Sequence, residues 1–477
     1  MTVLVGLDVG TTGVKALTVS AEGDVLAQVE EAYPLSTPQP GWAEQDPEDW
    51  WRAAESALEG LGVADLAGVG LTGQMHGLVV LDERERVLRP AILWNDQRTG
   101  AECAEIEERL GLGRLVELTG NRAMPGFTAP KLLWLRRHEP EVYERIAHVL
   151  LPKDYVRLRL TGEHAIDATD ASGTLLFDVA ARHWSDDVLA ALEIRREWLP
   201  SVVESSVVAG HTPDGIPVAA GAGDQAAGAL GVGVDRPGPL SVVLGTSGVV
   251  FAALEAFAAD PEGRLHSFCH AVPGAWHAMG VMLSAAGSLR WLRDAVAPGK
   301  SFEILTGEAE PWPPGAEGLV FLPYLAGERT PHADPNARGA FVGLSLRHDR
   351  GALARAVLEG VAFGLRDSLE LLKELGVDPQ VGRVSGGGAR SDLWLRIVAS
   401  VLGVPLERAV VDEGAAYGAA LLGGVAAGVF ADVHEAVAAC VRVRGRIDPE
   451  PAWADRYASG YERFRALYPA LRPLEGP

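Results

Sequence analysis

Cysteine is scarce in this sequence, and the few that occur are far apart. The 477 residues include three, Cys103, Cys269 and Cys440, and no two of them form a Cys-x-x-Cys pair. This excludes a disulfide framework and a cysteine-based zinc site. Unpaired cysteines are typical of a reducing compartment, so we expect a cytoplasmic protein.

Long apolar runs and excess positive charge are also missing. No stretch of about 18 uninterrupted apolar residues occurs, which argues against a membrane span. The acid at position 8 and the lack of a long apolar run argue against an N-terminal signal peptide. Lys plus Arg number 42 and Asp plus Glu 64, so the formal net charge is −22. That charge disfavours non-specific binding to nucleic acid or anionic membrane, although a local site could still hold an anionic nucleotide.

The length and composition indicate a globular protein with more than one core. Hydrophobic residues make up 48% and charged residues 22% of the sequence, which is ordinary for a globular chain. A chain of 477 residues exceeds what one core usually serves. We therefore expect two large domains.

The first strand and turn of the chain are suited to a phosphate and a metal ion. Val3 to Leu7 is an apolar run that predicts a buried strand, and Asp8 follows it. Gly10-Thr11-Thr12-Gly13 predicts a tight turn, whose N–H groups and hydroxyls could bind an anion. A carboxylate beside a phosphate favours a Mg²⁺ ion between them. The alternative is an ordinary hairpin whose Asp and Gly form the turn.

A similar turn recurs about half the chain further on. Gly245-Thr246-Ser247-Gly248 lies between two apolar segments, Ser241 to Leu244 and Val249 to Ala252. A duplicated fold with two phosphate-binding hairpins that face each other would explain this repeat. A chance match of four small residues is the alternative.

Polar residues that could bind a sugar follow two predicted strands. Gln74, Met75 and His76 come after the strand Leu66 to Leu71, where ligands bind in open α/β sheets. The alternative is a polar loop with a satisfied histidine. Trp94 and Asp96 suit a sugar-facing rim, because rings pack on C–H faces and polar groups bind hydroxyls. The alternative for Asp96 is a structural pair with Arg98.

Two further segments place small residues beside chemistry-bearing groups. Asp224 is the lone carboxylate in the segment Gly221 to Ala229, so a ligand could approach it closely. The alternative is a helix N-cap, which we also expect Asp224 to be. Gly386, Gly387 and Gly388 occupy a strand-to-helix junction and allow flat approach of a base or ribose. Residues 167–173 predict a loop at the cleft or a turn.

Together these segments resemble the FGGY family of sugar and polyol kinases, over Val3 to about Gly428. Residues 126–138 look like the first family signature and residues 339–359 like the second, with a departure at Ala352. The resemblance implies an α/β fold of two actin/hexokinase-like (ribonuclease H-like) domains with a cleft between them. It implies a sugar-binding domain at 1–235 and an ATP-binding domain at 236–477.

The resemblance also implies roles for the residues above. Asp224 would be the catalytic base, Asp8 would serve the metal and the reaction, and Met75 and His76 would contact the sugar. Gln74, Trp94 and Asp96 complete the predicted sugar site. The predicted ATP-binding residues are Thr11, Thr12, Lys15, Gly245, Thr246, Gly287, Gly387, Gly388 and Ser391, the last at a position where relatives often have Asn.

Within the family, Gln74-Met75-His76-Gly77 is similar to xylulokinases, and the Arg-Glu pair of glycerol kinases is absent here. This implies Mg²⁺- and ATP-dependent phosphorylation of D-xylulose at its 5-hydroxyl, in a protein whose partners are a sugar and ATP. The alternatives are a kinase for ribulose, fuculose, gluconate or glycerol, with Arg98 as a cation for gluconate, and a non-catalytic sugar-sensing ATP switch. A chaperone-type ATPase is a weaker one, because no peptide-binding β-domain is evident. The oligomeric state stays open, with a homodimer as one alternative.

Overall fold

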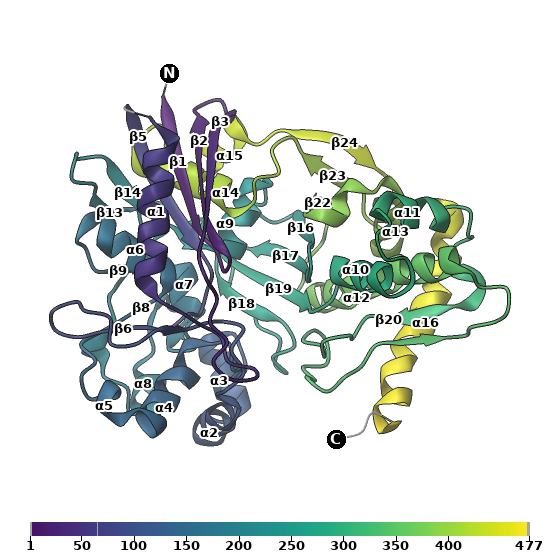
Figure 1. The fold of residues 1–477 in the computed structure, drawn as a ribbon, viewed down its shortest axis with the longest axis horizontal. Coiled ribbons are helices and arrows are strands. Elements are labelled where there is room, and N and C mark those ends of the chain that lie inside the picture. Colours follow the sequence, from purple (N-terminus) through teal and green to yellow (C-terminus); the bar gives the residue numbers. More distant parts are fainter. Residues whose placement is uncertain (1, 64, 475–477) are drawn as a thin grey trace.

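The computed structural model describes residues 2–63 and 65–474, which form two halves, each built on a mixed sheet (Figure 1). The strands of the first sheet run in the order β13-β14-β5-β1-β2-β3, and β15 also pairs with β5. Their bounds are β1 Val3–Val9, β2 Gly13–Ser20, β3 Val25–Ala32, β5 Leu66–Gly73, β13 Val208–His211, β14 Pro217–Ala219 and β15 Ala222–Gly223.

The second sheet has the order β18-β19-β17-β16-β22-β23-β24. Its strands are β16 Pro239–Leu244, β17 Gly248–Leu254, β18 His266–Cys269, β19 Trp276–Met282, β22 Val381–Ser385, β23 Leu406–Ala409 and β24 Val443–Ile447. In both sheets a hairpin, β1-β2 or β16-β17, pairs in parallel with a strand from further along the chain, β5 or β22. This shared topology confirms the predicted duplication.

Short strands form two-stranded ladders outside the two sheets. These are β4 Glu44–Gln45 with β7 Ala91–Ile92, β6 Val79–Leu81 with β8 His148–Leu150, β9 Ala165–Asp167 with β12 Ser201–Val203, β10 Phe177–Asp178 with β11 His183–Trp184, and β20 Val320–Leu322 with β21 Ala340–Val342. Most of them belong to the segment between β5 and β13.

The helices of the first half are α1 Pro47–Leu61, α2 Gly100–Leu110, α3 Leu112–Thr119, α4 Thr128–His138, α5 Pro140–Tyr143, α6 Pro152–Thr161, α7 Ala168–Ser172, α8 Asp186–Leu192 and α9 Asp224–Gly231. Asp46 followed by Pro47 predicts the start of a helix, and Asp46 caps α1 by accepting a hydrogen bond from Glu48 N at 3.0 Å. The expectation of a loop over residues 167–173 was wrong. These residues form the buried helix α7, because the Asp167 side chain caps its first turn.

The helices of the second half are α10 Ala286–Val296, α11 Phe302–Ala309, α12 Arg350–Glu374, α13 Asp392–Leu402, α14 Ala415–Ala426, α15 Val433–Cys440 and α16 Ala454–Leu471. The long helix α12 packs against β17, β19 and β20 and carries much of the apolar core of this half. Among the described residues, no helix combines the length and the apolar character that crossing a membrane requires.

Helix α14 leaves the second half and packs on the first sheet. A Cβ atom added at Gly6 of β1 or at Gly70 of β5 would lie 1.8 Å from a backbone oxygen of α14. Helices α14 and α15 share an apolar core with β1 and β2. The predicted division at residues 235 and 236 separates the strands of the two sheets, while α14 and α15 lie with the first of them; the division itself stays a prediction.

Candidate active site

Two carboxylates meet at one end of the first sheet. Strands β1 and β15 flank β5, and both Asp8 and Ala222 are register partners of Thr72. Asp224 comes two residues after Ala222, at the start of α9. Since adjacent strands lie about 4.8 Å apart, the backbones at the two acids are separated by roughly two strand spacings. Burial, and next the charge of Asp224, raise the pKa of Asp8 to about 7.

Asp8 has the surroundings of a metal-binding carboxylate. Its Oδ1 is buried and has no hydrogen-bond partner. Lys15, its register partner on β2, opposes the pKa rise but forms its ion pair elsewhere, with Glu413 at 2.5 Å. A buried oxygen without a donor beside a second carboxylate is a position where a divalent cation would be favourable.

Asp224 is free to accept a proton. The expectation that it caps α9 was wrong: Gly223 is the N-cap residue, and Asp224 is the first helical residue. Its side chain accepts a hydrogen bond from Gln225 Nε2 at 3.4 Å. Burial raises the pKa of Asp224 to about 6, against the hydrogen bonds from Gln225. A partly exposed carboxylate with that pKa is ionised near neutral pH and suits a general base.

His76 is held as a neutral acceptor. Its Nδ1 lies 2.6 Å from the carbonyl oxygen of Gly173, so Nδ1 carries the proton and donates it. Burial lowers the pKa of His76 to about 3, which leaves Nε2 unprotonated as an acceptor. The backbone φ of 68° is left-handed, and Lys131 Nζ donates to the His76 carbonyl at 2.8 Å.

Met75 and Gln74 lie beside His76 with different surroundings. Met75 is buried and packs against Gly173 and Gly223, where an added Cβ would lie 2.8 Å from its Sδ. The Gln74 amide is used by the protein. Its Nε2 donates to Gly10 O and to Gln45 Oε1, and its Oε1 accepts from Thr11 Oγ1 at 3.3 Å. Gln74 therefore ties the strand end to the first turn, and its contact with a sugar stays a prediction.

Trp94 is at the rim, whereas Asp96 is enclosed. The Trp94 ring is 38% exposed and donates from Nε1 to Thr11 Oγ1 at 3.0 Å. Asp96 is fully buried and accepts hydrogen bonds from Ala43 N and from Arg98, whose guanidinium also lies over the Trp42 ring at 3.6 Å. This geometry agrees with the structural pair that we held as the alternative. A direct sugar contact by Asp96 is not supported by these surroundings.

The first turn offers backbone and hydroxyl groups beside Asp8. Gly10 N donates to Gly13 O at 3.1 Å and closes the turn. The Thr11 hydroxyl lies between Trp94 and Gln74, while Thr12 is exposed at the tip. Lys15 is one-quarter exposed and bridges the two halves through Glu413. Phosphate contacts by these residues stay predictions.

The second turn docks on the N-terminus of α10. Ala286 N donates to Gly245 O, and Gly287 N donates to Thr246 O, at 2.8 and 3.1 Å. Thr246 is exposed, and its hydroxyl lies 3.3 Å from Arg290 Nη2. The turn carbonyl oxygens thus occupy the first N–H groups of α10, while the side chains of Thr246 and Arg290 are exposed beside them.

A cavity of about 1180 Å³ adjoins this turn. Gly387, Gly388 and Ser391 line it, together with Ala286 and Arg290 of α10. Gly387 is exposed, with no atom within 4 Å of an added Cβ, while the Ser391 hydroxyl caps α13 by accepting from Trp394 N. The volume and the flat glycine wall are suitable for a nucleoside.

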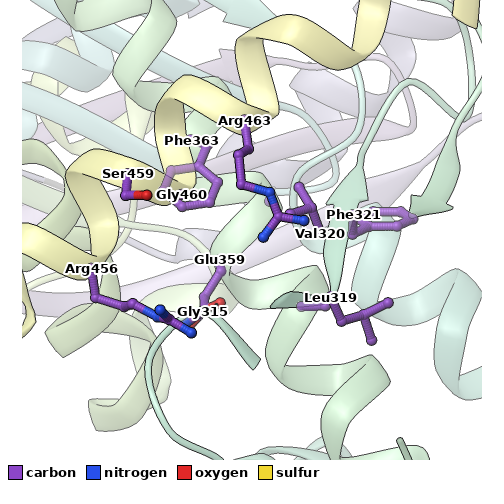
Figure 2. Close-up of a pocket in the computed structure, with 12 residues that line it drawn as sticks. Gly315, Leu319, Val320, Phe321, Glu359, Phe363, Arg456, Ser459, Gly460 and Arg463 are labelled. Carbon is purple, nitrogen blue, oxygen red and sulfur yellow. Dashed lines mark hydrogen bonds between the residues drawn. The ribbon is translucent and has the colours of Figure 1, made fainter. Parts of the chain in front are cut away.

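A second, much smaller pocket lies between α12, α16 and β20, where Figure 2 shows Glu359, Arg456 and Arg463 around it. Its volume is about 30 Å³, enough for little more than water. Glu359 is already satisfied there by Gly315 N, Arg355 and Tyr457. This pocket plays no part in the candidate site.

The structure adds a residue that the sequence did not reveal. The segment 328–338 had no assigned role, and it carries Arg329 close enough to lower the pKa values of His76 and His266, secondary to burial. The loop is held by Thr330, whose Oγ1 accepts from Val281 N at 3.0 Å. The Arg329 guanidinium of the second half thus lies near His76 of the first half.

Comparisons with known proteins agree with this arrangement. Residues 3–231 match the N-terminal domain of the FGGY family of carbohydrate kinases, and residues 240–427 match the C-terminal domain. The xylulose kinase of Escherichia coli strain K12 is 45% identical over 484 residues, covering 98% of this chain and 99% of that protein. The crystal structure of xylulose kinase from Rhodospirillum rubrum is 36% identical, with a TM-score of 0.92 and 99% of each chain covered.

Gluconate kinase from Lactobacillus acidophilus, at 26% identity, has a TM-score of 0.93 and covers 98% of each chain. The fold alone therefore does not distinguish between kinases that are named for different sugars. The two-domain α/β fold predicted from the sequence is confirmed. The chain belongs to the FGGY family of carbohydrate kinases.

Proposed function

We propose that this protein phosphorylates D-xylulose at its 5-hydroxyl with ATP as the phosphoryl donor. The observation that carries the reaction type is the convergence of Asp8 and Asp224 at one sheet edge, beside His76. The choice of sugar rests on the xylulose kinases that this chain matches at 34% to 45% identity over 87% to 99% of its length.

In the proposed reaction Asp224 accepts the proton of the attacking hydroxyl. Its pKa of about 6 keeps it ionised at neutral pH and leaves it basic enough to share the proton as the oxygen bonds to phosphorus. His76 Nε2 would accept a hydrogen bond from another sugar hydroxyl, and buried Met75 would cover an apolar face of the sugar. Phosphoryl transfer depends mostly on alignment and charge stabilisation, so this set of groups is sufficient.

Asp8 is the residue that we propose as the Mg²⁺ ligand. A cation there would give the buried Oδ1 a partner and would offset the repulsion from Asp224 that contributes to the raised pKa of Asp8. When bound, Mg²⁺ supplies charge neutralisation at the phosphate oxygens. The chain's own contribution is to hold the carboxylate at the strand end next to the first turn.

ATP would lie across the two halves. The large cavity beside Gly387 would take the nucleoside, and the two turns at Thr12 and Thr246 would meet the phosphates. Arg290 and Arg390 line that cavity together with acids such as Glu303, so it offers cations to the phosphates without a net positive charge.

The surroundings of Arg98 weaken the gluconate alternative. Its side chain is 1% exposed and forms ion pairs with Glu44 and Asp96 at 2.7 Å. A guanidinium that is enclosed in this way is not available to a substrate carboxylate. The Arg-Glu pair of glycerol kinases is absent from residues 74–77, so glycerol is also disfavoured.

A panel assay tests the proposal. ADP formation is coupled to NADH oxidation and measured with Mg²⁺-ATP and, in turn, D-xylulose, D-ribulose, L-fuculose, D-gluconate and glycerol. We expect D-xylulose to give the highest kcat/KM. A higher kcat/KM for another sugar would contradict the choice of substrate, and ADP formation that is independent of every sugar would contradict the kinase assignment.

A further inference from the structure

Five ionisable residues form a fully buried cluster behind the candidate site. Lys153, Asp154, Arg157, Asp167 and Asp170 are each 0% exposed. Lys153 Nζ lies 2.6 Å from Asp154, 2.8 Å from Asp167 and 3.3 Å from Asp170, and Arg157 also pairs with Asp154, at 3.0 Å. The three carboxyl groups thus surround one ammonium group in place of a metal ion.

Burying such charges is costly, and apolar side chains would fill the same volume with equal or better stability. Burial raises the pKa of Asp170 well above its usual value, and the charge of Lys153 opposes that rise. Burial lowers the pKa of Lys153, but the three neighbouring acids together raise it above its usual value, so the ammonium stays charged. A buried charge network of this kind fixes the positions of the groups that it contacts and does not add to the net stability of the fold.

Two members of the cluster donate hydrogen bonds to the backbone that leads to Asp224. Lys153 Nζ and Arg157 Nη1 both donate to the carbonyl oxygen of Ala220, at 3.2 and 2.8 Å. On the other side, the same backbone lies against β5, where a Cβ atom added at Gly221 would meet Leu71 O at 2.1 Å. The segment is thus fixed from both sides immediately before the acid.

Helix α7 connects the cluster by hydrogen bonds to the segment before Asp224 and to His76. Asp167 caps its first turn by accepting from Thr169 N at 2.9 Å. The Thr169 hydroxyl accepts from Gly223 N at 2.7 Å, one residue before Asp224. The carbonyl oxygen of Gly173, directly after the helix, accepts from His76 Nδ1 at 2.6 Å.

We infer that Lys153, Asp167 and Thr169 are positioning residues. They hold His76 and Asp224 at a fixed separation for the reacting sugar. This inference rests on the proposed function. All three side chains are 0% exposed, and they act through Ala220, Gly223 and Gly173. Misplacement of a reacting group by about 1 Å is enough to lower turnover by about a hundred-fold.

The first test removes one hydroxyl group without changing charge. Thr169→Val removes both the acceptor for Gly223 N and the donor to Asp167 Oδ1, and Thr169→Ser keeps both. We expect Thr169→Val to lower kcat for D-xylulose by about ten- to a hundred-fold, with little change in KM for ATP, and to shift the acidic limb of the kcat/KM profile. Thr169→Ser should restore both. A folded Thr169→Val protein with wild-type kcat and an unshifted acidic limb would overturn the inference.

The second test uses a matched buried cation. Lys153→Met removes the central ammonium, and the control Arg355→Met breaks another buried ion pair, Arg355 with Glu359 at 2.7 Å, in the second half. We expect both to lower the melting temperature, and only Lys153→Met to lower kcat at a temperature where both are folded. Equal stability losses with full kcat in both would overturn the inference. Wild-type activity is measured first, because its absence for every sugar would contradict the proposed function instead.

Discussion

Asp224 is a carboxylate at the start of a helix and is not its N-cap residue. Its side-chain hydrogen bond from Gln225 Nε2, at 3.4 Å, is long, and burial raises the pKa of Asp224 to about 6. We expect Asp224→Asn to keep sugar binding, measured by calorimetry, and to lower kcat by about a hundred-fold or more, the scale of losing a general base. The control is Asp235→Asn, at a buried acid that pairs with Arg236 and His434 away from the site. Equal kcat in the two variants would contradict the proposal that Asp224 is the general base.

The pKa of Asp224 also predicts the pH dependence of activity. The carboxylate must be ionised to act as a base, so kcat/KM for the sugar should be constant above about pH 6 and fall about tenfold per unit below it. The measurement is a coupled assay from pH 5 to 8, with the coupling enzymes in excess at each pH. A profile that is flat from pH 5 to 7 would show that another group removes the proton.

At the scale of residues, the sequence predicts which side chains are chemically suited to a site better than it predicts what surrounds them. Asp8 and Asp224 could be singled out because each follows a strand among small residues. The enclosure of Asp96 could not, since it depends on Trp42, Ala43 and Arg98 folding around it. The tautomer of His76 likewise depends on Gly173, nearly a hundred residues away.

Helix α14 is the element through which the second half of the chain packs on the first sheet. Its backbone packs directly on the glycines of β1 and β5, and a Cβ atom at Gly70 would lie 1.8 Å from Ala419 O. We expect Gly70→Ala to lower the free energy of unfolding by about 1–3 kcal/mol or more, because backbone on both sides must move.

Urea unfolding measures that change. The control is Gly113→Ala in α3, where an added Cβ has nothing within 4 Å and φ is not left-handed. This control should be neutral or slightly stabilising, since alanine is the better helix former. If Gly70→Ala were as stable as the control, the close contact between α14 and β5 would be contradicted.

Most elements of the fold could be predicted from apolar periodicity and turn residues. The sequence predicts helices over Ala352 to Leu375 and over Asp392 to Leu402, and α12 and α13 lie there, with the bounds of α13 in agreement at both ends. Helix α7 was missed because five residues are too few to show a helical period, and because its polar side chains are buried by tertiary contacts. The packing of α14 on the opposite half has no local signal at all.

The whole molecule contains two similar sheets whose hairpin turns are flanked by different residues. Only the first turn follows an acid, Asp8, while the second follows Val243 and docks on α10 with Arg290 nearby. This asymmetry supports the proposal that the sugar and metal bind to the first half and the nucleoside to the second. Lys15 and Glu413 form an ion pair between hairpin β1-β2 and the segment before α14.

The product of the reaction tests the central claim most directly. D-Xylulose and Mg²⁺-ATP are incubated with the wild-type protein and with the Asp224→Asn variant, and the products are resolved by ³¹P NMR and mass spectrometry. We predict that the wild type forms one ADP for each xylulose 5-phosphate, and that the variant forms neither at a comparable rate. Release of inorganic phosphate without a sugar phosphate, or equal product from both proteins, would contradict the account.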